Sequence, residues 1–324
     1  MDVSKWKTEY ENSYVPMESV LIKFLGVDGY DVYNCSVPFM WNQKHYIYGR
    51  IERHDEWMRS WVGLFERVEK DTYQLVPKSM IYQLEDPFVS VIHGELVLGG
   101  THVRIRQGKL DSYCGYFYKG HDIMDMYYFT TGPDRMKDIR LVELKDGKIG
   151  VFSRPRGEHL IEKYGTAAIV GFAVIDSLDD LSAEVIENAE NIPGLFKEGQ
   201  WGGCNQAYLL SSGMIGVVGH ICYNYIDEED INQACYMNMA FVMDPNTREI
   251  YDYQIIGTRK LFPPYPIKKK NLADCVFPSG IVMRSDGKVD LYSGLSDSAE
   301  GRIAIENPFN NYGSIVSNNL YGVI

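Results

Sequence analysis

No run of eighteen apolar residues occurs in the 324-residue chain, so the sequence predicts no transmembrane helix. The first fourteen residues are polar and charged and contain no apolar signal core. The six cysteines form no CxxC pair, and their spacing matches no common zinc pattern. Together these absences favour a cytoplasmic protein that has reduced thiols and no metal site.

Basic residues are also in the minority. The chain has 32 Lys and Arg against 44 Asp and Glu, which gives a formal net charge of −12. Nucleic acids and anionic membranes both need a basic surface, so we expect neither as a partner. A local basic pocket for phosphate is compatible with this charge. The one dense basic run, 268–270, is expected to be a solvated loop.

Long amphipathic helices are scarce, whereas predicted strand pairs are abundant. The best helix candidate is a short stretch at 177–189, which Pro193 and Gly194 bring to an end. Five times, a short alternating strand, a tight turn and a second strand follow one another. The five turns lie at 42–43, 93–94, 146–147, 212–213 and 286–287. Most contain Asp-Gly, Ser-Gly or His-Gly, and glycine accepts the positive φ that hairpin turns require.

Five hairpins spread along the chain favour an all-β fold, a five-bladed β-propeller. Their unequal spacing excludes a WD40-type repeat of fixed period. The intervals are long enough for four strands and a loop each, and five radial sheets leave only short edges. A β-sandwich or two β-domains are the alternatives. No linker rich in Gly, Ser or Pro divides the chain, so we expect residues 1–324 to form a single catalytic domain.

The innermost strands of a propeller converge on a central pocket, so the polar residues beside the hairpins are the candidates for a site. Glu85 and Asp86 stand directly before Pro87 and an apolar strand. Proline biases the preceding residue to extended geometry, which would aim Asp86 at the inner edge of its blade. Partial burial there would raise the pKa of this carboxyl group and let it donate a proton. For an isolated Asp-Pro, a turn-capping role is the alternative.

Two further groups contain arginines. Arg50 and Glu52 alternate along a predicted strand and would share one face, although an ion pair on the surface would explain them equally. Arg154 and Arg156 lie in a loop bounded by Pro and Gly, which suits bidentate binding of an anion. Two solvated arginines are the alternative there.

The last groups contain His220 and two aspartates. A lone histidine after an apolar strand is usually structural, but His220 occupies the same position in its blade as Arg154. Asp274 and Asp297 flank the last hairpin and would bind sugar hydroxyls, or else form turns. The remaining candidates for substrate binding are Asn34, Arg53, His102, Asn205 and Gln206.

The order of these segments resembles glycoside hydrolase family 130, whose members are five-bladed propellers that phosphorolyse β-mannosides. The resemblance is carried by 85–87, 153–155, His220, Tyr236, 276–280 and 292–297. The segments 30–35 and 203–206 look more like glycosyltransferase family 108, which contains mannosyltransferases and phosphorylases of β-1,2-linked mannan. The resemblance covers the chain from about Asp31 to about Asp297, and its specificity lies in the ordered set rather than in any one motif.

The resemblance implies inverting phosphorolysis, or the reverse synthesis, of β-1,2-mannooligosaccharides with mannose 1-phosphate as the sugar phosphate. Asp86 would be the general acid. Arg154, His220 and Tyr236 would bind phosphate, and Asp297 would contact the nonreducing sugar. The implied partners are a mannose-containing oligosaccharide and inorganic phosphate as co-substrate, with no cofactor and no metal. The oligomeric state stays open, a homo-oligomer included.

Three departures from the family pattern stand out. Phe88 replaces an arginine, Ser153 replaces a histidine, and the phosphate-binding lysine has no match, since Asn205 or Gln206 occupies that region.

Three other functions therefore stay open. An inverting hydrolase would need Glu85, Glu52 or another carboxylate to activate water. A GDP-mannose-dependent transferase and a non-catalytic carbohydrate-binding propeller are the remaining alternatives.

Overall fold

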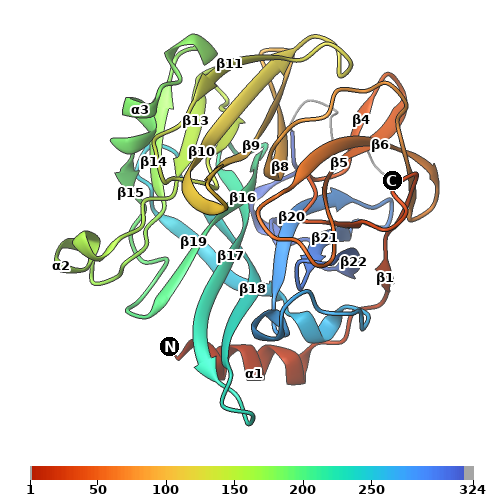
Figure 1. The fold of residues 1–324 in the computed structure, drawn as a ribbon. Helices are drawn as coiled ribbons and strands as arrows, with labels where there is room; N and C mark the ends of the chain where they lie inside the picture. Colours follow the sequence, from red (N-terminus) through yellow and green to blue (C-terminus); the bar gives the residue numbers. More distant parts are fainter. Residues whose placement is uncertain (1, 317–324) are drawn as a thin grey trace.

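Five sheets surround a central axis in the computed structural model, which describes residues 2–316 (Figure 1). Apart from the N-terminal strand Ser19–Leu21, which joins the last sheet, the strands of each sheet come from one continuous segment of the chain. Neighbouring sheets contact each other through their inner strands. This arrangement is a five-bladed β-propeller, so the predicted all-β fold class is confirmed.

The first sheet contains β2 (Lys23–Leu25), β3 (Asp31–Tyr33), β4 (Phe39–Trp41), β5 (Lys44–Glu52), β6 (Trp61–Glu69) and β7 (Thr72–Leu75). The second contains β8 (Glu85–Ile92), β9 (Glu95–Arg106), β10 (Lys109–Gly120) and β11 (Tyr127–Thr131). The third contains β12 (Arg140–Glu143), β13 (Ile149–Ser153), β14 (Gly171–Ile175) and β15 (Glu190–Asn191). The fourth contains β16 (Gln200–Leu209), β17 (Ile215–Ile226), β18 (Asn232–Met243) and β19 (Ile250–Gly257). The fifth contains β20 (Val276–Met283), β21 (Val289–Leu295), β22 (Ala299–Ile305) and the N-terminal β1 (Ser19–Leu21).

All five predicted hairpins are present, and each joins an inner strand to the next strand of its sheet. They are β4–β5, β8–β9, β12–β13, β16–β17 and β20–β21. At the β8–β9 turn, His93 and Gly94 have φ values of 51° and 80°. Two consecutive positive φ values match the twist of the flanking strands, which is why this turn type closes tight hairpins.

The ring closes where the N-terminal strand joins the last sheet. Strand β1 pairs antiparallel with β22. Arg302 of β22 lies at this junction, and its guanidinium donates to Asp71 of the first sheet at 2.8 Å and to Glu18, beside β1, at 2.8 Å. A third carboxylate, Asp290, accepts from it at 3.1 Å. The buried guanidinium therefore ties the two ends of the ring together.

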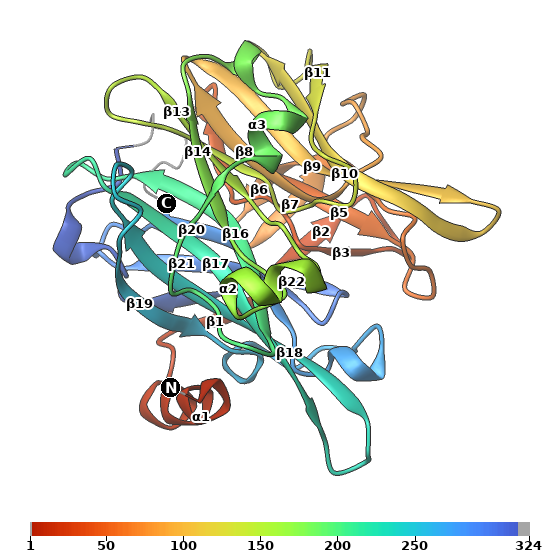
Figure 2. The same cartoon turned by 90° about the vertical axis from the view of Figure 1, so that its left-hand side faces the viewer.

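Helices are few and lie outside the sheets. They are α1 (Val3–Ser13), α2 (Ile161–Tyr164), α3 (Ala183–Glu187) and single 3₁₀ turns at Glu158–Leu160, Leu178–Asp180, Arg259–Leu261, Lys270–Leu272 and Asn310–Tyr312. The helical stretch predicted at 177–189 is confirmed as two short turns. Helix α1, seen at the base of the molecule in Figure 2, was not predicted from the charged N-terminal segment. No helix within residues 2–316 is long and apolar enough to cross a membrane.

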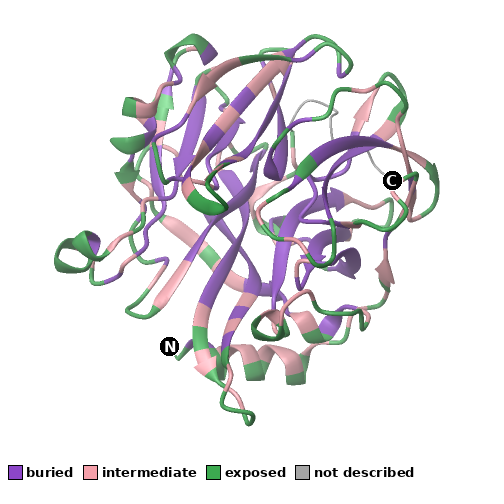
Figure 3. Cartoon of the chain, viewed as in Figure 1, coloured by how far each residue is buried: buried purple, intermediate pink, exposed green. Residues whose placement is uncertain are grey.

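The buried residues lie mainly in the strands of the five sheets. The strands around the centre are buried on both faces, because each sheet packs between two neighbours, whereas exposed residues concentrate in the turns (Figure 3). Strand β21, for example, is buried along its whole length. The sheets therefore form a rigid frame, and the loops at its centre are free to carry polar side chains.

Candidate active site

A pocket with a volume of about 430 Å³ lies where the inner parts of the five sheets meet. Its lining includes polar or aromatic residues from or next to every sheet. They are Asn34, Arg50, Glu85, Asp86, Lys137, Tyr236, Phe277 and Asp297. Six of these residues are predicted site residues, and Lys137 and Phe277 are additional.

Asp86 reaches the pocket by a backbone conformation that differs from the expected one. Its φ is +49°, so the prediction of extended geometry before Pro87 is wrong. The pairing of β8 with β9 shifts register between Glu85 and Phe88, and such a bulge turns a residue out of the strand ladder. Asn34 and Asp297 also have positive φ values. Asn and Asp tolerate this left-handed region better than most residues, and functional sites often contain such strain.

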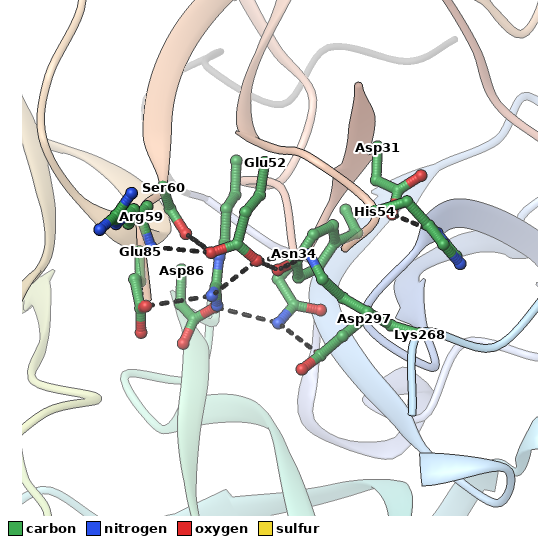
Figure 4. A network of polar contacts seen from close by, with 12 residues as sticks. Asp31, Asn34, Glu52, His54, Arg59, Ser60, Glu85, Asp86, Lys268 and Asp297 are labelled. Carbon is green, nitrogen blue, oxygen red and sulfur yellow. Dashed lines mark hydrogen bonds and ion pairs between the residues drawn. The ribbon is translucent and has the colours of Figure 1, made fainter. Parts of the chain in front are cut away.

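Arg50 organises the acidic side of the pocket, where Asn34, Glu85 and Asp86 lie close together (Figure 4). Its guanidinium donates to Asp86 at 2.9 Å, to Glu85 at 3.0 Å and to the hydroxyl of Ser60 at 2.8 Å. Asn34 also donates to Asp86, at 3.0 Å. The carboxylate of Asp86 is therefore fixed from two directions by residues of the first sheet.

Glu52 is buried behind Arg50, and both of its carboxylate oxygens already have partners. It accepts from Ser60 at 3.0 Å, from the backbone N–H of Arg59 at 2.9 Å and from the hydroxyl of Tyr33. Lys268 forms an ion pair with the same carboxylate, and its side chain is only 2% exposed. The prediction that 268–270 is a solvated loop is therefore wrong for Lys268, because Glu52 of a distant blade holds it in the interior.

A cationic group faces Asp86 from the third and fourth sheets. The amino group of Lys137 lies 3.7 Å from Asp86. The adjacent Asp138 forms an ion pair with Arg154 at 3.2 Å and lies 4.0 Å from Nε2 of His220. Lys137 therefore connects the carboxylate of Asp86 to the predicted phosphate-binding residues.

Lys137 and Asp138 were missed in the sequence. The feature that could have identified them is their position. Both stand shortly before strand β12, as Glu85 and Asp86 stand at the start of β8. Asp138 also shares the positive φ of Asp86, at 58°.

His220 and Tyr236 form the wall beside Arg154. Their rings stack at a centroid distance of 5.8 Å, and Nδ1 of His220 lies 2.6 Å from Oδ1 of Asn205. Burial lowers the pKa of His220 to about 3, so the ring is neutral near pH 7. Because Oδ1 of Asn205 accepts from Nδ1, the single N–H of the neutral ring is used there, and Nε2 is left as an acceptor. Arg154 donates to the carbonyl of Gly202 at 3.1 Å, which holds its guanidinium in place.

Several polar atoms around this group have no hydrogen-bond partner among residues 2–316. They are Nε2 of His220, Nδ2 of Asn205 and Oγ of Ser153. Buried polar atoms are normally satisfied, so a cluster of them indicates a position for a polar ligand.

The charges set the protonation of the three pocket carboxyl groups. Burial alone would raise the pKa of Asp86, but Arg50 and Lys137 hold it below its usual value. The expected raised pKa of Asp86 is therefore wrong in direction. Burial does raise the pKa of Glu85 and of Asp297, whose cationic neighbours compensate less.

Arg154, His220 and Asn205 are not part of the pocket lining, and the remaining predicted residues also lie outside it. Arg53 lines an adjoining groove. His102 contacts the carbonyl of Gln83 at 3.1 Å and stacks on Tyr116. Gln206 donates to the carbonyl of Val89 at 3.1 Å.

Asp274 likewise faces away from the pocket. Its carboxylate forms an ion pair with Lys7 of helix α1 at 2.9 Å. This position is that of a structural contact rather than of a sugar ligand. Within the described residues, no group of three or more His, Cys, Asp or Glu is placed to hold a metal ion.

Comparison with known proteins gives close relatives among solved structures. A mannose phosphorylase from Leishmania mexicana, in complex with phosphate ion, is 50% identical with a TM-score of 0.93, over 99% of this chain and 98% of that chain. A GDP-Man-dependent mannosyltransferase from Leishmania mexicana is 47% identical with a TM-score of 0.91, over 98% of each chain. A β-1,2-mannobiose phosphorylase from Listeria innocua is 13% identical with a TM-score of 0.58, over 89% of this chain and 94% of that chain, and shares the fold.

No curated protein matches the chain. The model of the family DUF1861, whose description reads "Protein of unknown function", matches residues 8–311. The resemblance to glycosyltransferase family 108 is confirmed by the two Leishmania relatives. This chain therefore belongs to the DUF1861 family, and the Leishmania mannose phosphorylase and mannosyltransferase are its relatives.

Proposed function

We propose that this protein is an inverting phosphorylase of β-1,2-mannooligosaccharides that exchanges mannose between a mannoside and mannose 1-phosphate. The observation that carries the proposal is the position of Asp86 opposite a buried cationic group, with Lys137 3.7 Å away and Arg154 behind it. The 50% identity to a mannose phosphorylase in complex with phosphate supports the same assignment.

In this reaction, a phosphate oxygen attacks the anomeric carbon while the bond from that carbon to the leaving oxygen breaks. Asp86 transfers its proton to the leaving oxygen, and the proton of hydrogen phosphate replaces it through solvent. Inversion converts the β-mannoside to α-mannose 1-phosphate. Phosphate is already a nucleophile, so no second carboxylate is needed as a base.

Phosphate also explains how Asp86 would become protonated. Arg50 and Lys137 hold the pKa of Asp86 below its usual value. A phosphate dianion beside Lys137 would compensate that positive charge and bring a negative charge toward Asp86. Like charges favour the protonated form of a carboxyl group, so phosphate binding would raise the pKa of Asp86.

The test is an assay of the wild type on β-1,2-mannobiose with and without phosphate, read for mannose 1-phosphate. The proposal expects sugar release that depends on phosphate and one mannose 1-phosphate for each bond broken. Equal release of free mannose without phosphate would overturn it.

A GDP-mannose-dependent mannosyltransferase is the second candidate, favoured by the 47% identity to such an enzyme. The same cationic group would then hold the diphosphate of the donor. Turnover of GDP-mannose with a mannose acceptor, measured as GDP release, tests it, and no release would exclude it.

A hydrolase fits the geometry less well. Glu52 is held by Lys268 and Ser60 and is buried away from the pocket, so it has no access to an attacking water. Glu85 is the other carboxylate that an inverting hydrolase would use, and it is paired with Arg50 at 3.0 Å. A non-catalytic sugar-binding protein would not need the Asp86–Lys137 pair.

We propose in addition that the enzyme acts in the cytoplasm without a cofactor. All six cysteines are free, and five of them are buried, which supports a reducing compartment.

A further inference from the structure

A second depression adjoins the pocket on the side of the first and second sheets. It has a volume of about 530 Å³. Met58 lines both the pocket and this groove, so the groove begins where the pocket ends. Ser60, another lining residue, bonds to Arg50, which holds Asp86. Two hydrogen bonds, Arg50 to Ser60 and Arg50 to Asp86, therefore link the groove wall to the proton donor.

The groove has the side chains of a sugar-binding surface. Trp61 and Tyr30 line it and are 47% and 43% exposed. Both rings are open to solvent, and the faces of aromatic rings can stack on the apolar faces of sugar rings. Arg53, whose guanidinium lies 5.8 Å above the Tyr30 ring, and Gln83 supply hydrogen-bonding groups beside them.

The geometry of the displacement directs the leaving chain toward this groove. In an inverting displacement, the nucleophile and the leaving group lie on opposite sides of the anomeric carbon. The cationic group, Lys137 and Arg154, belongs to the third sheet and has the neutral His220 of the fourth sheet beside it, whereas the groove lies between the first and second sheets. Asp86 stands between them, with one oxygen toward Arg50 and the other toward Lys137. A leaving chain that departs away from phosphate is therefore directed toward the groove.

We propose that this groove binds the sugar residues of the leaving chain beyond the residue next to the cleaved bond, so that the enzyme prefers longer chains to disaccharides. The inference rests on the proposed function and extends it to chain length. It applies equally to synthesis from a sugar nucleotide, because the diphosphate would occupy the cationic side and the acceptor chain the groove.

The experiment compares Trp61→Ala with the wild type on two substrates, the disaccharide β-1,2-mannobiose and the β-1,2-linked mannose pentasaccharide. Loss of one stacking contact is expected to lower kcat/KM for the pentasaccharide about tenfold. The disaccharide does not reach Trp61, so its kcat/KM should change by less than about twofold. The matched control is Tyr127→Ala, an exposed aromatic on the outer strand β11, which should alter neither substrate. Equal losses on both substrates, or no loss on either, would overturn the proposal.

Binding to an Asp86→Asn background separates this proposal from the proposed function. Calorimetric titration should show tighter binding of the pentasaccharide than of the disaccharide, and Trp61→Ala should remove the difference. If neither sugar binds, the proposed function fails. If both bind equally and Trp61→Ala changes nothing, only the groove assignment fails. Loss of GDP binding in Trp61→Ala would assign the groove to a nucleotide and would also overturn the proposal.

Discussion

The amino group of Lys137 lies 3.7 Å from the carboxylate of Asp86, and the two residues come from the starts of adjacent inner strands. Each residue changes what the other can do. Together with Arg50, Lys137 holds the pKa of Asp86 below its usual value, and Asp86 helps to raise the pKa of the Lys137 ammonium against the opposing effect of burial. Phosphate placed beside Lys137 would release Asp86 from this pairing and prepare it to donate a proton.

Lys137→Met should weaken phosphate binding. Loss of one charged hydrogen bond costs about 1.5–3 kcal/mol, which corresponds to a roughly ten- to hundred-fold higher KM for phosphate. Loss of a cationic neighbour also raises the pKa of Asp86, so the fall in activity at high pH should move to higher pH. Steady-state kinetics at varied phosphate and pH measures both effects. Lys5→Ala on the exposed face of helix α1 is the control, and an unchanged KM for phosphate in Lys137→Met would contradict the assignment.

Asp86→Asn should lower kcat by about 10²–10⁴-fold, the usual contribution of a general acid. The loss should be far smaller for a nitrophenyl mannoside, because its leaving group needs no proton. Phosphorolysis rates on both substrates measure the difference. The same loss on both would show that Asp86 has a role other than proton donation.

Arg302→Met should destabilise the closure of the ring. It leaves Asp71 without a guanidinium partner and removes one of the two guanidinium groups that contact Glu18 and Asp290. Removal of one partner of a buried ion pair costs about 3–5 kcal/mol. Urea unfolding measures the free energy of unfolding. Arg284→Met is the control, because Arg284 contacts Glu18 and Asp290 but lies nearer the solvent and should cost less. A loss below about 1 kcal/mol in Arg302→Met would show that pairing of β1 with β22 closes the ring without this arginine.

Glu300 should make stability depend on pH. Burial raises its pKa to about 8, although Ser279 donates to its carboxyl group at 2.6 Å. Between the ordinary value of about 4.5 and this value, the folded state holds a proton that the unfolded state has lost. Stability should therefore fall as the pH rises through this range, with a limiting slope of about 1.4 kcal/mol per pH unit.

Glu300→Gln removes this titration and should flatten the dependence of Tm on pH between about 5 and 8. Thermal unfolding at several pH values measures it, with Glu306→Gln, an exposed neighbour, as the control. An equally steep dependence in both variants would mean that another group causes it.

Part of the site could be predicted from the sequence. Glu85 and Asp86 stand at the start of β8, Arg50 near the end of β5 and Asn34 directly after β3, and these positions are local properties of the chain. The backbone conformation of Asp86 could not be predicted, because the bulge between Glu85 and Phe88 depends on pairing with β9. The direction of the pKa shift of Asp86 could not be predicted either, since it depends on Lys137, a residue in the next blade along the chain.

The amino-acid sequence determined the hairpins and hence the five-bladed ring, because turn chemistry and strand alternation act between neighbouring residues. Only the tertiary structure decided which polar residues meet at the centre. It buried Lys268 against Glu52, turned Asp274 toward Lys7 and brought Lys137 to Asp86. The physical reason is that the Coulomb energy of two charges depends on their separation in space and on burial, and both are set only once the ring has closed.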